Sequence, residues 1–151
     1  MRWSRLKQIT ESRFASEARG RVELWITQYR YRISMLHEER RSWITIDGIE
    51  IVNMSRWNER DGIRFGFSEH DARRFELGVF EPCDLTLACR AMLTLSIDDA
   101  LASTNPLVRS LAVLDVRCGK RRRRQIDIDR ETPLVAACLR IRMQKTSAST
   151  C

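Results

Sequence analysis

The chain has 151 residues and a net charge of +7, with 43% hydrophobic and 31% charged residues. This composition excludes a disordered chain, and the length is sufficient for one domain that buries a core without metals or disulfides. No apolar run approaches the roughly 20 residues that a membrane-spanning helix needs, and the N-terminus lacks the apolar core of a signal peptide. We therefore expect a cytoplasmic protein that does not enter a membrane, with a single domain over residues 1–144 and a disordered tail over residues 145–151.

The first predicted elements are a helix and a strand. The spacing of apolar residues predicts a helix over residues 4–18, which Gly20 would end. Alternation with a period of two then predicts a strand over residues 22–32. One face of this strand would carry Val22, Leu24 and Ile26, and the other would carry Trp25, Thr27, Tyr29 and Tyr31. Residues 33–41 are polar and predict a connection.

Residues 43–52 predict a β-hairpin. Asp47-Gly48 suits a two-residue type I′ turn, whose central residues need positive φ angles. This turn would place Ile46 opposite Ile49 and Ile44 opposite Ile51, so all four isoleucines would be buried on one face. On the other face Thr45 would lie opposite Glu50 and Trp43 opposite Val52. Residues 53–62 predict a loop, and residues 63–67 are a candidate fourth strand.

The second half of the sequence predicts helices. We expect them over residues 68–77 and 84–95, in a short stretch after Ser96, over residues 106–118, and after Thr132. Asn105 should cap the fourth helix, and Gly119 should end it in a left-handed conformation. The predicted fold is α+β: an N-terminal helix, a small, mainly antiparallel sheet of three to four strands, and a C-terminal helical block.

Four stretches of the sequence resemble a family of small uncharacterised bacterial proteins. They are WSRLK near the N-terminus, GRVE at residues 20–23, the hairpin WITIDGIEIVN and the segment NPLVRSLAVLDVRCGKRR. The GKRR ending is the most specific of these. The family carries no established activity, so the resemblance implies a bacterial cytoplasmic setting and assigns no functional residue.

Residues with catalytic or ligand-binding chemistry form no recognisable motif. The two histidines, His37 and His70, have no zinc-ligand spacing around them. Ser68, His70 and Asp71 fit a helix cap better than a catalytic triad, whose members converge in space. The five cysteines are an odd number without a C-x-x-C pair, which predicts free thiols in a reducing compartment. We assign no catalytic residue, metal or cofactor, and favour a non-enzymatic binding protein.

The strongest candidate site is a basic cluster at residues 117–124. Six of these eight residues are cationic and none is acidic: Arg117, Lys120, Arg121, Arg122, Arg123 and Arg124. Clustered arginines bind phosphate well, which favours nucleic acid or another polyanion as the ligand. Alternatively, the cluster is neutralised within the protein by its flanking acids, or by the acidic stretch of residues 42–116. The flanking acids are Asp115, Asp127, Asp129 and Glu131.

A weaker candidate site is the aromatic face of the predicted sheet. Trp25, Tyr29, Tyr31 and Trp43 would gather there and could stack on nucleic-acid bases. A covering N-terminal helix that buries them is the favoured alternative. Two functions remain: binding of nucleic acid or another polyanion through residues 117–124, or a small regulatory or immunity-like module that binds an acidic protein surface. The sequence does not predict the oligomeric state.

Overall fold

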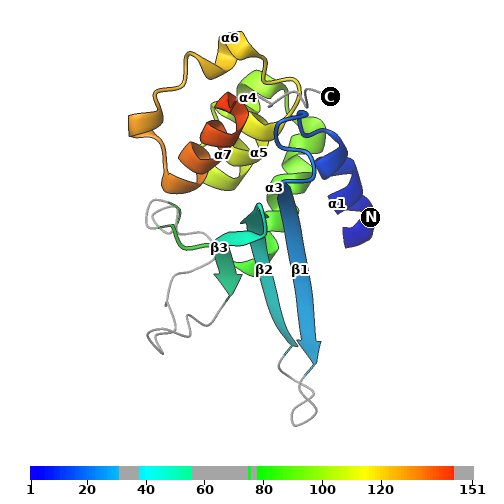
Figure 1. The fold of residues 1–151 in the computed structure, drawn as a ribbon. Helices are drawn as coiled ribbons and strands as arrows, with labels where there is room; N and C mark the ends of the chain where they lie inside the picture. Colours follow the sequence, from blue (N-terminus) through cyan, green and yellow to red (C-terminus); the bar gives the residue numbers. More distant parts are fainter. Residues whose placement is uncertain (31–37, 56–74, 76–77, 145–151) are drawn as a thin grey trace, which may run out of the picture.

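A three-stranded antiparallel sheet and a block of helices make up the fold. The computed structural model describes residues 1–30, 38–55, 75 and 78–144. In Figure 1 the sheet extends from one end of the molecule and the helices gather at the other, with α1 beside β1. The fold is therefore α+β, as the sequence predicts. Residues 145–151, the predicted tail, lie outside the described residues.

The N-terminal helix is shorter than the sequence predicts. α1 spans Trp3–Ser12, and the chain then pairs in an extended conformation with a segment about 100 residues later. The Ala15 N–H donates to the Leu114 carbonyl at 2.9 Å, and the Val116 N–H donates to the Arg13 carbonyl at 2.8 Å. The prediction of a helix to residue 18 was wrong, because the N–H of Ala15 and the carbonyl of Arg13 form hydrogen bonds with this distant segment instead of bonds within a helix.

The sheet contains three described strands in the order β1-β2-β3, which span Val22–Arg30, Glu38–Ile46 and Ile49–Ser55. β2 begins inside the predicted connection, so the prediction was wrong for residues 38–41. There the extended chain is held by pairing with β1, as in the pair Gln28 and Arg40. The candidate fourth strand at residues 63–67 lies outside the described residues.

The β2–β3 hairpin has the predicted turn and a different register. Asp47 and Gly48 have φ angles of 51° and 79°, as a type I′ turn requires. Ile46 lies opposite Ile49 as predicted, but a β-bulge then places Ile44 opposite Val52. The bulge adds one residue to β3, so the four isoleucines do not form one buried row. Ile44 is 1% exposed, whereas Ile49 is 70% exposed.

The predicted register was therefore wrong beyond Thr45. Thr45 does lie opposite Glu50, as expected, whereas Trp43 lies opposite Asn53 rather than Val52. The sequence of β3 does not reveal the bulge, because Ile51 and Val52 are both β-branched and either could face the core.

The core lies between the sheet and the helical block. Val22, Leu24, Ile44 and Met54 of the sheet are almost completely buried and belong to the same cluster as the apolar faces of the helices. The Ser42 hydroxyl, also buried, donates to the Pro82 carbonyl at 2.7 Å and joins β2 to the start of α3. Large helical side chains that are fully buried in this core include Leu85, Leu107, Leu111, Leu114 and Leu139.

The described helices after the sheet begin at capping residues. α3 spans Pro82–Thr94, α4 Ile97–Leu101, α5 Pro106–Leu114, α6 Lys120–Arg123 and α7 Pro133–Met143, and a 3₁₀ turn spans Ile128–Arg130. Ser96, Asn105 and Thr132 accept hydrogen bonds from backbone N–H groups of the first turns, which confirms the predicted caps. The predicted helix over residues 68–77 lies outside the described residues, apart from the helical Phe75.

α5 ends four residues before the predicted boundary. Asp115 adopts an extended conformation and pairs with Phe14, which stops the helix at Leu114. Gly119 has a φ of −67° and stands at the N-cap of α6, so the prediction of a left-handed glycine was wrong. The basic residues that follow it form a helical turn of their own.

Candidate anion-binding surface

The basic residues 117–124 lie on a turn and on the short helix α6. Cys118 is fully buried before this helix, and Ile126 packs partly buried against the core after it. These two apolar anchors fix α6 to the core, while the charged residues between them stay near the surface. Figure 1 shows α6 at the end of the helical block that faces away from the sheet.

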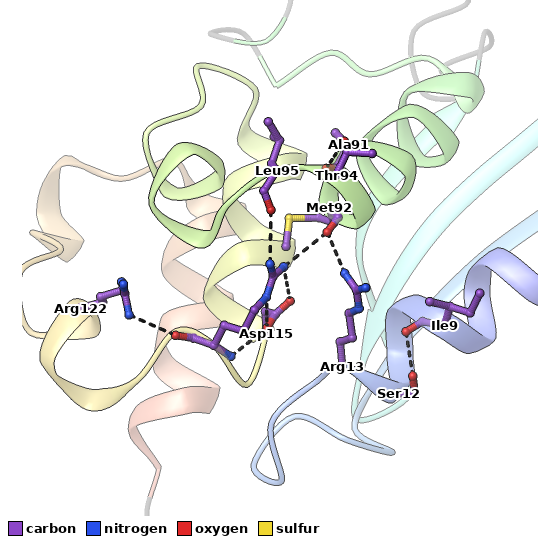
Figure 2. Close-up of polar contacts among 10 residues, drawn as sticks. Ile9, Ser12, Arg13, Ala91, Met92, Thr94, Leu95, Asp115 and Arg122 are labelled. Atoms are coloured by element: carbon purple, nitrogen blue, oxygen red, sulfur yellow. Dashed lines mark hydrogen bonds and ion pairs between the residues drawn. The ribbon is translucent and has the colours of Figure 1, made fainter.

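Arg117 is used to cap a helix. Its guanidinium donates to the Asp115 carboxylate at 2.8 and 3.1 Å, and to the Met92 and Leu95 carbonyls at 3.3 Å each. These carbonyls lie at the C-terminal end of α3, where Arg13 also donates to Met92 at 2.9 Å (Figure 2). Cations at a helix C-terminus satisfy its last carbonyls and complement its dipole. The hydrogen bond with Asp115 also raises the pKa of Arg117.

Arg122 is paired with Asp98 of α4. The two side chains meet in a fork, with Nε–Oδ1 at 2.6 Å and Nη2–Oδ2 at 3.0 Å. This hydrogen bonding lowers the pKa of the Asp98 carboxyl group and raises that of Arg122. Asp98 belongs to the acidic stretch of residues 42–116, so this stretch does supply part of the neutralisation. The fork fixes the orientation of α6 relative to α4.

Arg123 and Arg142 share the carboxylate of Glu17. The Arg142 Nη1 donates to Glu17 at 2.7 Å, and the Arg123 Nη1 lies 3.6 Å from the other carboxylate oxygen. Arg142 is 4% exposed and also donates to the Val113 carbonyl at 3.1 Å and the Cys118 carbonyl at 2.8 Å. Burial lowers the pKa of Arg142, and the positive charge of Arg123 lowers it further.

The pKa of Glu17 reflects the same surroundings. Burial acts to raise this pKa, but hydrogen bonds from its own backbone and from Ser16 and the charges of Arg142 and Arg123 outweigh it and lower the value. Glu17 is therefore a carboxylate at neutral pH and offsets one of the two arginine charges beside it.

Three exposed cations of the cluster differ from Arg117, Arg122 and Arg123 in their lack of partners among the residues that the structure describes: Lys120, Arg121 and Arg124. Within the described part of the chain their side chains form no ion pair and donate no hydrogen bond. Of the acids that flank the cluster, Asp115 pairs with Arg117, whereas Asp127 and Glu131 pair with Arg130 and Arg109. The six cations predicted as one site are thus divided into three that hold the fold and three that face solvent.

Two hollows lie beside α6 and differ in charge. The larger, of about 310 Å³, is lined by Asp98, Gly119, Arg121, Arg122 and Gln125. The smaller, of about 190 Å³, is lined by Lys120, Arg123, Arg124, Arg142 and Met143. An acid lines the larger hollow and none lines the smaller one, so the smaller hollow is the more strongly cationic of the two.

The aromatic pair predicted on the sheet is present but enclosed by cations. The rings of Trp25 and Trp43 stack with centroids 5.9 Å apart and planes 9° apart. Lys7 Nζ lies 4.1 Å from the centroid of Trp25, and the guanidinium of Arg41 lies 4.6 Å from that of Trp43. Each ring therefore already has an aromatic and a cationic neighbour.

The other two aromatic candidates are Tyr29 and Tyr31. Tyr29 lies further along β1, opposite Glu39, and Tyr31 lies outside the described residues. α1 contributes Lys7 to the aromatic face and leaves Trp25 38% exposed, so it covers this face only in part. Glu11 of α1 instead accepts the Leu24 N–H of β1 at 2.8 Å.

A family model, the SF0329 protein family, matches residues 2–143 and so covers nearly the whole chain. The chain belongs to the SF0329 protein family. This confirms the predicted membership of a family without an established activity. No significant match to the chain was found among the curated proteins or among the solved structures.

One residue of the site, Arg142, was not predicted from the sequence. It lines the smaller hollow and lies within the part of the chain that matches the SF0329 family. Leu134, Cys138 and Ile141 lie at helical spacing along α7, and all three are buried. Arg142 lies four residues after Cys138 and therefore on the same side of the helix. An arginine on the apolar face of a helix indicates that its side chain is buried and paired with an acid.

The described part of this SF0329 family member provides no metal site. Within residues 1–30, 38–55, 75 and 78–144, no group of three or more His, Cys, Asp or Glu side chains could hold a metal ion. His37 lies outside the described residues, as do Ser68, His70 and Asp71. Across the same ranges, no helix is both long and apolar enough to cross a membrane.

Proposed function

We propose that this protein binds nucleic acid through α6 and the residue after it. The supporting observation is that Lys120, Arg121 and Arg124 are exposed and form no ion pair with any described residue. Exposed, adjacent cations repel one another, and a polyanion relieves this repulsion while it releases its own counterions. Arginine and lysine also donate hydrogen bonds to phosphate oxygens without reading the base sequence. We expect binding with little sequence preference.

The division of the cluster sets the expected strength of this binding. Each phosphate neutralised on duplex DNA contributes about −0.9 to the slope of log K against log salt concentration. Three free cations therefore predict a slope of roughly −3, whereas all six would have given one nearer −5. Arg117, Arg122 and Arg123 should add little, because their charges are already paired with Asp115, Asp98 and Glu17.

Fluorescence anisotropy with a labelled duplex at several salt concentrations tests this proposal. The variant Lys120→Gln/Arg121→Gln/Arg124→Gln should lose most of its affinity at low salt, and its slope should approach zero. The matched control is Arg2→Gln/Arg5→Gln/Arg90→Gln, which removes the same three charges from exposed positions on and beside α1 and on α3. The control should keep a slope close to that of the wild type.

Two outcomes would contradict the proposal. One is a wild type that fails to bind at low salt. The other is an equal reduction of the slope in both triple variants, which would indicate attraction by net charge alone. Circular dichroism should show that both variants fold, since all six side chains are exposed.

A protein partner with an acidic surface is the second candidate. The observation in its favour is that one apolar side chain lies exposed near the same cations. Met143 shares the smaller hollow with Lys120 and Arg124 and is 68% exposed. Protein interfaces combine apolar centres with charged rims, whereas phosphate backbones need no apolar contact. Absence of nucleic-acid binding at low salt would place this candidate first.

We also propose that the protein works in a bacterial cytoplasm. The buried cysteines Cys89, Cys118 and Cys138 are free thiols, as is usual in a reducing compartment. The motif resemblance to a bacterial family supports the same setting.

A further inference from the structure

The smaller hollow beside α6 concentrates positive charge more than any other described part of the cluster. Four cations line it, and Glu17, the carboxylate paired with two of them, leaves an excess of three positive charges. In the larger hollow, Asp98 offsets one of the two arginines and leaves an excess of one. An anion should therefore prefer the smaller hollow.

Two of its four cations are fixed in place, and two have no partner among the described residues. Arg142 is buried, and its Nε, Nη1 and Nη2 all donate within the protein, so its charge cannot move away. Arg123 is held beside Glu17, and its Nη1 is buried without a hydrogen-bond partner. Lys120 and Arg124 are exposed at the rim and have N–H groups to donate. The hollow thus combines a fixed positive wall with two adaptable donors.

The two arginines of this wall repel each other, because only one carboxylate of the described ranges, that of Glu17, lies between them. The charge of Arg123 is one cause of the lowered pKa of Arg142, after burial. Met143 forms an apolar side of the same hollow. Clefts lined by one sign of charge and bounded by low-dielectric walls focus their electric field on the ligand. A bound anion would be attracted strongly and would reduce the repulsion between the two arginines.

We propose that this hollow binds a single phosphate group of the monoester type, which in a nucleic acid is the terminal phosphate of a strand. A phosphomonoester carries a charge of about −1.5 to −2 at neutral pH and presents three acceptor oxygens. This charge matches the excess in the hollow better than the single charge of an internal phosphodiester. A hollow of about 190 Å³ has room for such a group, since one water occupies about 30 Å³ of liquid volume.

This inference rests on the proposed nucleic-acid binding and goes beyond it, because it predicts a preference for strand ends. Lys120 and Arg124 should donate hydrogen bonds to the phosphate oxygens. Arg142 and Arg123 should attract the phosphate through their positive charges. Arg121, which lines the larger hollow, should contact the strand only as a general cation. These different roles allow each residue to be tested separately.

The experiment compares labelled single strands with and without a terminal phosphate, in one pair at the 5′ end and in another at the 3′ end. For one of these pairs the wild type should bind the phosphorylated strand about tenfold more tightly, the effect of one or two charge-assisted hydrogen bonds. Lys120→Gln/Arg124→Gln should bring this ratio close to one. Arg121→Gln should weaken binding of both strands and leave the ratio unchanged.

Competition with inorganic phosphate distinguishes a site for free phosphate from a site for the terminal phosphate of a strand. Phosphate added at constant ionic strength should displace the phosphorylated strand from the wild type and not from the double variant. Binding of inorganic phosphate without binding of any strand would keep the site and overturn the nucleic-acid function. A ratio of one in the wild type, or a tenfold ratio that survives in Lys120→Gln/Arg124→Gln, would overturn the phosphate site. The nucleic-acid function would still stand if the salt slope depended on α6.

Discussion

The arginines of this protein differ in role because their partners differ. Arg142 is buried with a carboxylate and two carbonyls, Arg117 caps a helix, and Arg121 faces solvent. All three have the same side chain, and the basic run shows no difference between Arg117 and Arg121. The position of Asp115 in the turn before the run decides that Arg117 folds back onto the protein. At the residue scale, the acids that the arginines meet in the fold separate structural cations from free ones, whether they are close in sequence, as Asp115 is to Arg117, or distant, as Glu17 is from Arg142.

Replacement of Arg142 tests the structural role directly. Arg142→Ala should lower the free energy of unfolding by about 3–5 kcal/mol, because it removes one partner of a buried ion pair and leaves two carbonyls unpaired. The control Arg140→Ala removes an exposed arginine from the same helix and should change it by less than about 0.5 kcal/mol. Urea unfolding followed by circular dichroism measures both. Equal losses in the two variants would show that Arg142 does not support the core.

At the element scale the hairpin offers a similar contrast between two isoleucines. Ile44→Ala should lower the free energy of unfolding by about 2–5 kcal/mol, because Ile44 is 1% exposed and its loss leaves a cavity. Ile49→Ala should cost less than about 0.5 kcal/mol, since Ile49 is 70% exposed. Thermal melts of the two variants measure both losses. Similar losses would contradict the burial of Ile44 and the exposure of Ile49.

Local signals in the sequence predicted some elements correctly and not others. Asn105-Pro106, Thr132-Pro133 and Asp47-Gly48 act within a few residues, and the structure places a cap or turn at each. The predicted ends of α1 and α5 were wrong because residues 13–15 pair with residues 114–116. No local sequence pattern predicts that pairing. Gly119 was misread for the same reason, since the helix it was expected to end had already stopped.

The difference between local and distant interactions also limits how much of the candidate site the sequence predicts. The basic cluster itself was visible in the sequence, and so was its excess of charge. The pairs Arg122–Asp98 and Arg123–Glu17 span 24 and 106 residues, so the division into paired and free cations depends on the tertiary fold. Arg142 completes the smaller hollow from the last helix and was not predicted.

The whole molecule places three thiols in one continuous core. Cys89 of α3, Cys118 before α6 and Cys138 of α7 are each 1% exposed or less. Burial raises the pKa of Cys118, and it raises the pKa values of Cys89 and Cys138 to about 12. In the unfolded chain a thiol has a pKa of about 8.5. The folded state therefore keeps protons that the unfolded state releases at alkaline pH.

This difference predicts how the stability of the whole molecule depends on pH. The stability that the protonated thiols contribute is fully present below about pH 8.5 and is lost as the pH rises from there toward 12. Each of the two thiols should remove about 1.4 kcal/mol per pH unit in this range. Cys89→Ala/Cys138→Ala should lack this loss, so its stability should fall less steeply than that of the wild type between pH 9 and 10.5, by about 2–3 kcal/mol per pH unit. Urea unfolding at several pH values measures the two slopes. Parallel slopes for the wild type and the double variant would show that these thiols ionise as easily in the folded protein as in the unfolded chain, which would contradict their burial in the core.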